Sequence, residues 1–444
     1  MNRKRFVQLT IVLLAVCTCK MPFKFKNTPP QPYIDEISQV GSEVTVKLYA
    51  EDPEDDSVSL KVDFGDGYVT QWSEFVRSGY IIEFTHQYSS SGNYTMKIQA
   101  KDEYGAESEF EYNYLVGWWA KTDLGLCYYF MFNVAVGDGQ GDDKPRVYAA
   151  CGHICELEWT ESGWVKRDLV DLSQWYEEEP YIRDVTVEDG RGIYATSDEH
   201  VYKFGYSGEP FYPWSYTLVG SGNSWMEDVA VGDGRGDGKP RVYAACGDNH
   251  VYEFEWTDSG WVKTDLGSGG SDMEDVAVGD GRGDGKPRVY AACNDYHIYE
   301  FEWNGSSWIK TDLGSGGIML GIALGDGRGD GKPRVYAACE DNHVYEFEWD
   351  GSSWVKRDLG SGGGDMLGVA VGDGRGDDKP RVYVACADGH VYEFEWNGSS
   401  WIKTDLGSGG SCMNGVAVGD GRGDGKPRVY VACGDNHVYE FEWK

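Results

Sequence analysis

The chain has 444 residues and a formal net charge of −34, and it contains 61 glycines, 30 tyrosines and 17 tryptophans. This charge argues against a nucleic-acid partner, which needs a basic surface that neutralises phosphates, and it disfavours docking on anionic lipid. The glycine and aromatic content favours β-structure with many tight turns, and the acidic surface permits cation binding.

Residues 1–19 have the pattern of an export signal. A basic start precedes the apolar run FVQLTIVLLAV, which is too short for a comfortable membrane span. The segment LAVC, Leu14 to Cys17, resembles a lipoprotein cleavage box, although Val16 departs from the small residue usual before the cysteine. The segment predicts an exported protein. The segment is either cleaved, or it attaches the protein to a membrane directly or through a lipidated Cys17. Residues 20–27 have the composition of a linker.

Residues 28–117 alternate apolar and polar side chains in short runs, which predicts a small β-sandwich. The motifs VDFGDG, HQY and GNYTMKIQAKDEYG resemble the PKD-domain family over nearly the whole region. This resemblance implies an extracellular spacer or adhesion module, and some members of the family hold calcium. Asp52, Asp55 and Asp56 are the candidate calcium ligands here, and a solvated acidic turn is the alternative.

Residues 118–444 form a repeat array. Each unit contains four short strand candidates, such as VAV, PRVYAAC, HVYEFEW and WVKTDLG, and this pattern is typical of a β-propeller blade. We therefore predict an all-β protein in which the PKD-like sandwich is followed by a seven-bladed propeller. The units begin at Val134, Val185, Val229, Val276, Ile322, Val369 and Val416.

The two ends of the array complement each other. The last unit stops after VYEFEWK and lacks a fourth strand, whereas WWAKTDLG, residues 118–125, precedes the first unit and matches that strand. We expect residues 118–125 to pair with residues 438–443, so that an N-terminal strand closes the ring and removes two unpaired sheet edges.

The segment GDGRGDGKPRV between the first two strands resembles the FG-GAP or VCBS repeat of integrin α-chain propellers. The resemblance implies calcium held by acids at loop positions one, three, five and nine. Two of these positions are arginine here, which removes the anionic oxygens that calcium needs. We expect the arginines to replace the metal by pairing with the loop aspartates. The clearest cases are Asp233, Arg235, Asp237 and Arg241, and Asp280, Arg282, Asp284 and Arg288.

The loop of the first unit keeps more acidic residues and is the best remaining calcium candidate. Its ligands would be Asp138, Asp142 and Asp143, although Arg146 is retained. The tripeptide Arg-Gly-Asp occurs in five copies of the same loop, which favours a structural turn over an integrin-binding motif.

The other repeated residues can be interpreted structurally or functionally. A histidine begins each third strand and is expected to make a local turn hydrogen bond. A cysteine ends six second strands and is expected to be a small buried apolar residue, with Cys151–Cys155 and Cys127–Cys412 as possible disulfides. Tryptophan pairs flank the hairpins and either stabilise them or form sugar-binding platforms. Glu253 and Glu255 predict a solvated or interblade charge pattern.

The second unit breaks the repeat because it lacks GDGKP and is framed by irregular segments. Irregular loops on a regular scaffold are where specificity tends to lie, so we expect an acidic and aromatic binding patch here, with a degenerate blade as the alternative. Its candidate residues are Trp175, Tyr176, Glu178, Tyr181, Tyr212 and Trp214.

We find no nucleophile elbow, HExxH motif or zinc-binding Cys/His spacing in the sequence. No catalytic residue or cofactor is therefore predicted, apart from the calcium considered above. The sequence favours an exported, non-catalytic binding or adhesion protein that acts as a protein-interaction scaffold. A multivalent lectin is the competing hypothesis, and a polysaccharide-degrading enzyme is the third. The expected partner is a surface protein or a glycan.

Overall fold

The computed structural model describes residues 27–127, 130–169, 181–208 and 214–444, and these divide into two compact units at the boundary between Gly117 and Trp118. The predicted export signal, with Cys17, lies outside the described residues. Within these ranges, no helix has the length and apolar character needed to cross a membrane.

The first unit is a sandwich of two three-stranded antiparallel sheets. Its core is formed by alternate side chains of facing strands, for example Val46, Leu48, Leu60 and Ile98, each fully buried. One sheet has the order β1-β2-β4 and the other β3-β5-β6. The strands are β1 (Gln31–Val40), β2 (Glu43–Glu51), β3 (Val58–Asp63), β4 (Ile82–Gln87), β5 (Gly92–Asp102) and β6 (Glu107–Val116).

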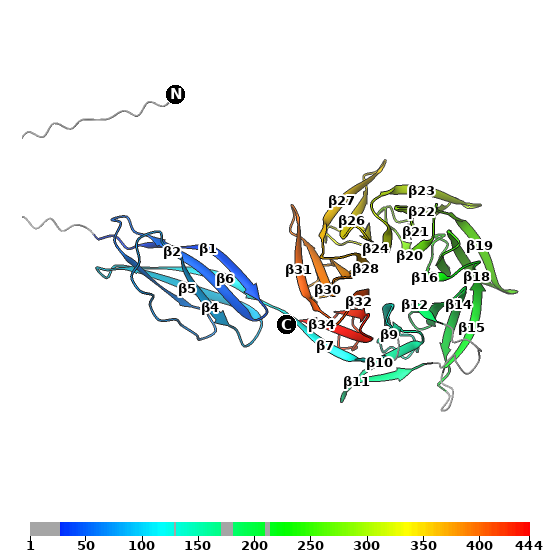
Figure 1. Cartoon of the computed structure of the whole chain (residues 1–444), viewed down its shortest axis with the longest axis horizontal. Coiled ribbons are helices and arrows are strands. Elements are labelled where there is room, and N and C mark those ends of the chain that lie inside the picture. The colour runs from blue at the N-terminus through cyan, green and yellow to red at the C-terminus, as the bar shows by residue number, and fades with distance from the viewer. Residues whose placement is uncertain (1–26, 128–129, 170–180, 209–213) are drawn as a thin grey trace, which may run out of the picture. The chain divides into compact units, whose positions relative to one another are not determined.

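The second unit is a ring of seven four-stranded antiparallel sheets, so the predicted all-β fold is confirmed (Figure 1). Blade one has β8 (Asn133–Gly137), β9 (Arg146–Ala150), β10 (Ile154–Thr160) and β11 (Gly163–Asp168). Blade two has β12 (Ile182–Glu188), β13 (Gly192–Ser197), β14 (His200–Tyr206) and β15 (Trp214–Ser221). Blade three has β16 (Met226–Gly232), β17 (Arg241–Cys246), β18 (His250–Thr257) and β19 (Gly260–Ser268).

The remaining blades follow the same order from the inner to the outer strand. Blade four has β20 (Met273–Gly279), β21 (Arg288–Cys293), β22 (His297–Trp303) and β23 (Trp308–Ser315). Blade five has β24 (Met319–Gly325), β25 (Arg334–Cys339), β26 (His343–Trp349) and β27 (Trp354–Ser361). Blade six has β28 (Met366–Gly372), β29 (Arg381–Cys386), β30 (His390–Trp396) and β31 (Trp401–Ser408). Blade seven has β32 (Met413–Gly419), β33 (Arg428–Cys433), β34 (His437–Trp443) and β7 (Trp119–Leu126).

The ring closes as the sequence predicts. Strand β7 pairs with β34 in blade seven, with Gly125 opposite Val438 and Trp119 opposite Trp443. This pairing gives the last blade its outer strand from the start of the array, so the outer edge of β34 is paired.

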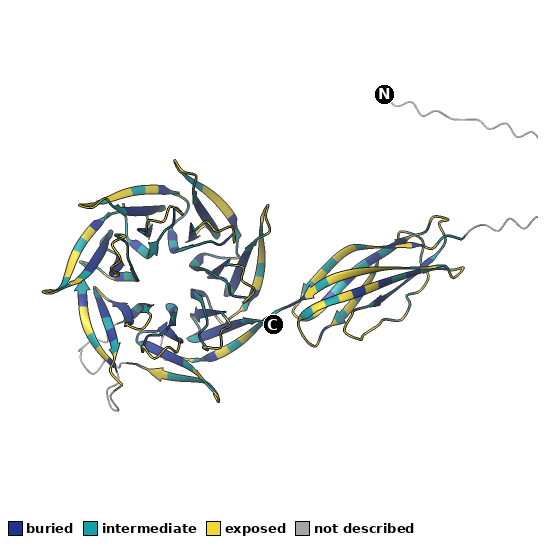
Figure 2. Ribbon diagram, turned by 180° about the vertical axis from the view of Figure 1, so that it is seen from behind, coloured by how far each residue is buried: buried dark blue, intermediate teal, exposed yellow. Residues whose placement is uncertain are grey.

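The core of the ring lies between successive blades. The second strand of each repeat, for example RVYAAC in β21, is buried on both faces, which explains its continuous apolar run. Tyr290 of blade four packs with Val335 and Phe347 of blade five, and the same cluster recurs around the ring. Exposed residues gather on the outermost strand of each blade (Figure 2).

Candidate functional site

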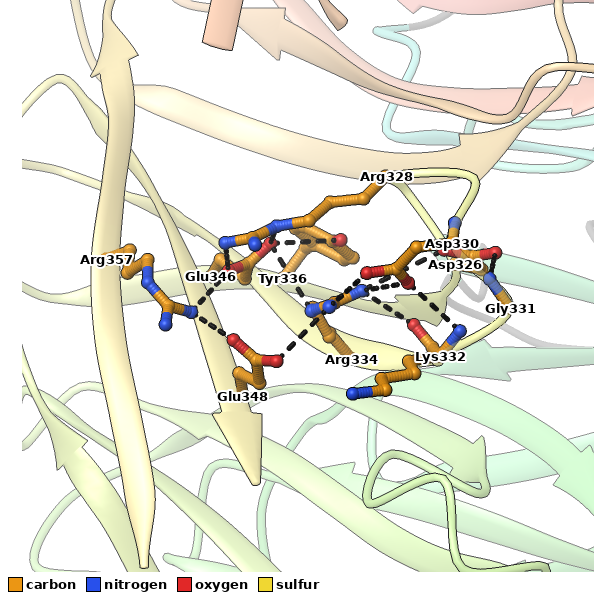
Figure 3. Close-up of polar contacts among 10 residues, drawn as sticks. All are labelled: Asp326, Arg328, Asp330, Gly331, Lys332, Arg334, Tyr336, Glu346, Glu348 and Arg357. Carbon is orange, nitrogen blue, oxygen red and sulfur yellow. Dashed lines mark hydrogen bonds and ion pairs between the residues drawn. The ribbon is translucent and has the colours of Figure 1, made fainter. Parts of the chain in front are cut away.

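The acidic loop between the first two strands is held together by its own side chains, as blade five illustrates (Figure 3). Asp326 accepts the backbone N–H groups of Asp330 and Gly331 at 3.1 and 2.6 Å. The buried Arg334 donates to both carboxylate oxygens of Asp330 at 2.9 and 2.8 Å. This fork lowers the pKa of Asp330. The expected pairing of an arginine with a loop aspartate is thus present at loop position nine.

The arginine at loop position three has a different partner from the one expected. Arg328 turns away from the loop aspartates, and its Nε donates to Glu346 of strand β26 at 2.8 Å. Tyr336 donates to the same carboxylate at 3.3 Å, and Glu346 is fully buried. Figure 3 shows these side chains, together with Arg334, gathered around Glu346.

Of the two patterns expected for these glutamates, solvated or interblade, the solvated one is therefore wrong for the first glutamate of HVYEFEW. Glu253, Glu300, Glu346, Glu393 and Glu440 are all fully buried. Arg235 and Arg282 pair with Glu253 and Glu300 instead of with the aspartates of their own loops. Sequence periodicity placed these glutamates on the polar face of the strand, but the next blade covers that face.

The calcium candidates of blade one are engaged in the same turn chemistry. Asp138 accepts three backbone N–H groups of its own loop, and both oxygens of Asp142 accept from Arg146 at 2.8 Å. These bonds lower the pKa of Asp142 to about 2. Asp143 has a φ of 60° at a turn position where most blades have glycine, so its place is explained by the left-handed backbone that aspartate tolerates.

The calcium candidates of the PKD region also form a turn. Asp52 is 7% exposed and accepts the backbone N–H groups of Glu54 and Asp56 at 2.9 and 3.1 Å. Asp55 has a φ of 62°, which is typical of a tight turn. Desolvation and the neighbouring Asp52 raise the pKa of Asp56.

A second function of the loop arginine is to cover an indole ring in the next blade. The guanidinium of Arg235 lies 4.3 Å from the ring centre of Trp303, which is a cation–π distance. The four equivalent pairs have separations of 4.1 to 4.3 Å, and they are Arg282–Trp349, Arg328–Trp396, Arg375–Trp443 and Arg422–Trp159.

Blade two lacks this loop arginine, so the tryptophan of blade three is uncovered. The β12–β13 connection is only Asp189 to Arg191, and Trp256 is 65% exposed. A groove of about 360 Å³ opens between the two blades. Its principal lining residues are Glu188, Arg191, Tyr194, Lys203, Trp256 and Trp261.

The polar side chains of this groove form one network. Glu188 accepts from Arg191 at 2.7 Å and from the hydroxyl of Tyr194 at 3.1 Å, and the Lys203 ammonium lies 3.8 Å away. Burial lowers the pKa of Lys203. The groove thus offers an open indole face beside two cationic groups, an arrangement that suits a flat ring or an aromatic side chain carrying a polar or anionic group.

The structure changes the binding patch expected on blade two. Trp175, Tyr176, Glu178 and Tyr212 lie outside the described residues. Trp214 is only 9% exposed and packs edge-on against Tyr148 of blade one at 6.5 Å, so its proposed role in ligand binding is replaced by a role in the core. Tyr181 is 38% exposed and packs against Phe132 at 5.2 Å.

The central channel of the ring is a second feature that sequence reasoning missed. The inner strands of all seven blades line a cavity of about 580 Å³. Asp184 is buried, and Asp228 and Asp275 are half-buried. These three aspartates each reach the next blade, where they accept the N–H groups of Val229, Val276 and Ile322 at 2.9 Å. Burial raises the pKa of Asp275 to about 7 and that of the other two as well.

The repeated histidines and cysteines have local partners. His250 Nδ1 lies 3.0 Å from Asp265 on the neighbouring strand, whereas Asp248 accepts the backbone N–H of His250. All nine described cysteines are free, so neither of the two pairs that the sequence left open, Cys151–Cys155 and Cys127–Cys412, is joined here. Burial raises the pKa of Cys246 to about 11, as expected for an inert apolar thiol.

One family model and two solved structures are similar to parts of this chain. Residues 27–115 match the family model described as PKD domain. The PKD domain of an M14-like peptidase from Thermoplasmatales archaeon SCGC AB-540-F20 is 24% identical, with a TM-score of 0.19 over 20% of this chain and 97% of that one. BBS1N, solved in complex with ARL6DN and soaked with lead, is 12% identical, with a TM-score of 0.49 over 72% of this chain and 94% of that one. No curated protein matches the chain.

The chain therefore contains a PKD domain followed by a propeller-like repeat. PKD domains are typical of extracellular and surface proteins.

Proposed function

We propose that this chain is an exported, non-catalytic binding protein. Its propeller is a protein-interaction scaffold, and its PKD domain is a spacer from the surface. The export signal within residues 1–19 supports the location, with attachment through the N-terminal segment or a lipidated Cys17. The FG-GAP or VCBS resemblance of the loops supports a propeller of the adhesion type, with arginine in place of calcium.

The observation that carries the proposal is the uncovered Trp256. Five other blade junctions have an arginine stacked on the corresponding tryptophan, whereas the groove beside blade two leaves an indole 65% exposed. An exposed aromatic anchor within a hollow is typical of a binding hot spot. The partner is a surface protein or a glycan, and the net charge of −34 disfavours nucleic acid.

The competing hypothesis of a multivalent lectin requires equivalent open sites on several blades. The arginine caps argue against it, because they cover the aromatic platforms that such a lectin would use. A polysaccharide-degrading enzyme needs a free pair of carboxylates, whereas Glu188 and Glu255 of the groove are held by Arg191 and Arg241 at 2.7 and 3.0 Å.

The test is a screen of the labelled full chain on a glycan array and on an array of surface-protein peptides. Trp256→Ala is compared with Trp349→Ala, which removes the same residue from a junction where Arg282 covers it. The proposal expects at least about tenfold weaker binding for Trp256→Ala alone, which corresponds to about 1.4 kcal/mol. Binding that Trp256→Ala leaves unchanged would overturn the assignment. Equal losses in both variants would favour the lectin.

A further inference from the structure

Blade one departs from the repeat at three positions that surround one buried cysteine. Cys151 is the cysteine that ends the second strand in six blades. In blade four the equivalent Cys293 is flanked by Gly269 and by the ring of Tyr299. In blade one the glycine is replaced by Cys127 and the tyrosine by Cys155, which faces Ala149 and Asp168 as Tyr252 faces Ala244 and Asp265 in blade three.

The backbone shows that Cys127 occupies the glycine position. Its N–H donates to the carbonyl of Asn436 at 2.8 Å, as that of Gly269 donates to Asn249 at 2.9 Å. A side chain at Gly269 would lie 2.6 Å from the Cys293 sulfur and 3.1 Å from Tyr299. In blade one the replacement of tyrosine by Cys155 removes the second of these contacts, whereas Cys151 retains the sulfur of the first.

The third change removes the partner of the lost tyrosine. In blade three Tyr252 donates to Asp248 at 2.6 Å, and the turn reads Cys246-Gly-Asp-Asn-His250. In blade one the turn is shortened to Cys151-Gly-His153, so His153 lies next to the thiols. The three changes together place sulfur and imidazole ligands where the other blades have an aromatic ring and an acid.

The three sulfur atoms lie within 4.8 Å of one another. The separation from Cys155 Sγ is 2.8 Å for Cys127 Sγ and 3.3 Å for Cys151 Sγ, and all three residues are buried. His153 Nε2 is 3.3 Å from Cys155 Sγ and 3.0 Å from Asp168, and its side chain is 15% exposed. Zinc bound tetrahedrally at about 2.3 Å holds its sulfur ligands roughly 3.8 Å apart, so these two sulfur pairs would move apart by about 1.0 and 0.5 Å on binding.

We propose that Cys127, Cys151 and Cys155 bind one thiolate-preferring metal ion, zinc, with His153 as the fourth ligand. A disulfide would use two of the three sulfurs and leave the third buried beside it, whereas a metal ion uses all three. Binding releases the protons of the thiols that are not yet ionised.

The site would cross-link the two blades that meet where the ring closes. Cys127 directly follows β7, which belongs to blade seven, whereas Cys151 and Cys155 belong to blade one. A metal ion would therefore join these two blades at the closure. A familiar zinc-binding spacing is absent from the sequence, because the closing segment supplies one ligand and a C-x-H-x-C segment, residues 151–155, supplies the others.

The full chain, purified under reducing conditions, is titrated with cobalt(II) and with zinc. The proposal expects one equivalent of cobalt with a thiolate-to-metal charge-transfer band, displacement by zinc, and a rise in Tm that a chelator reverses. Cys155→Ala should abolish the band. The double variant Cys127→Gly, Cys155→Tyr restores the residues of blades three to seven. It should also abolish the band, and it should do so in a folded protein. Cys293→Ala, which removes a repeat cysteine, should leave it unchanged.

Three outcomes would overturn the proposal. The first is the absence of a thiolate band at one equivalent of cobalt. The second is a band that persists in both variants of the trio. The third is a Cys127–Cys155 disulfide, found by non-reducing peptide mapping, in protein prepared with zinc present. None of these readouts depends on the partner bound at the blade-two groove.

Discussion

The guanidinium of Arg282 lies 4.2 Å from the ring centre of Trp349 in the next blade, and its Nε donates at 2.9 Å to the fully buried Glu300. One side chain thus neutralises a carboxylate within its own blade and covers an indole of the neighbouring blade. The same arrangement recurs around most of the ring, so loop chemistry and blade packing are coupled.

Arg282→Ala should lower the free energy of unfolding by about 3 kcal/mol, because it leaves Glu300 buried beside fewer cationic partners. Adding Glu300→Gln should restore part of this loss, since the remaining amide is neutral. Chemical denaturation of the two single variants and the double variant measures the coupling. Additive losses would show that the pair is not an energetic unit.

The six loop aspartates that pair with arginine should make the propeller sensitive to acid. The hydrogen bond from Arg288 lowers the pKa of Asp284 to about 2. A depressed pKa contributes stability above the unfolded value of about 4, and this contribution is lost as the pH falls towards about 2. Asp284→Asn should be less stable than wild type at pH 7, and the difference should shrink below about pH 3.

Denaturant unfolding between pH 7 and pH 2 measures this difference. The matched control is Asp258→Asn in an exposed turn, for which we expect a change within about 0.5 kcal/mol at every pH. A constant difference between Asp284→Asn and wild type across the range would contradict the ion-pair assignment.

The channel aspartates should have the opposite pH dependence. Burial raises the pKa of Asp275 to about 7, so its protonated form is favoured in the folded protein. This contribution is present below about pH 4 and is lost as the pH rises through about 7. Asp275→Asn keeps the acceptor for Ile322 N–H and should flatten the decline of stability between pH 5 and pH 8.

Thermal unfolding across that range is the measurement for Asp275→Asn. Glu161→Gln, in an exposed hairpin turn, is the control and should follow the wild-type curve. An unchanged decline in Asp275→Asn would show that other groups cause it.

A substitution at the ring closure should destabilise the protein more than the same substitution within an ordinary blade. Trp119 packs against Trp443 at 5.5 Å, and Trp119→Ala should cost about 3 kcal/mol. Trp401→Ala is the matched control, because Trp401 packs against Trp396 at 5.5 Å within a hairpin. We expect a smaller loss and less aggregation for the control, since its strand is tethered by a short turn. Equal losses in calorimetry and light scattering would count against a special role for the closure.

Several calcium ligands expected from the loops became turn acceptors for a reason that local sequence does not contain. The motif specifies where aspartate and arginine stand, and Arg241 pairs with Asp237 four residues away, as local geometry allows. Arg235 instead pairs with Glu253, which is distant in the sequence and fully buried, while the same guanidinium covers Trp303 of the next blade. The tertiary environment of the arginine therefore decided which acid it neutralises.

The sequence by itself determined the strand order, the number of blades and the closing strand, because four-strand periodicity and the missing last strand are properties of the chain. The uncovered Trp256 and the meeting of Cys127 with Cys151 and Cys155 were decided by the tertiary structure. Each depends on contacts between blades. A shortened loop or a replaced aromatic ring in one blade changes the surroundings of a side chain from the neighbouring blade.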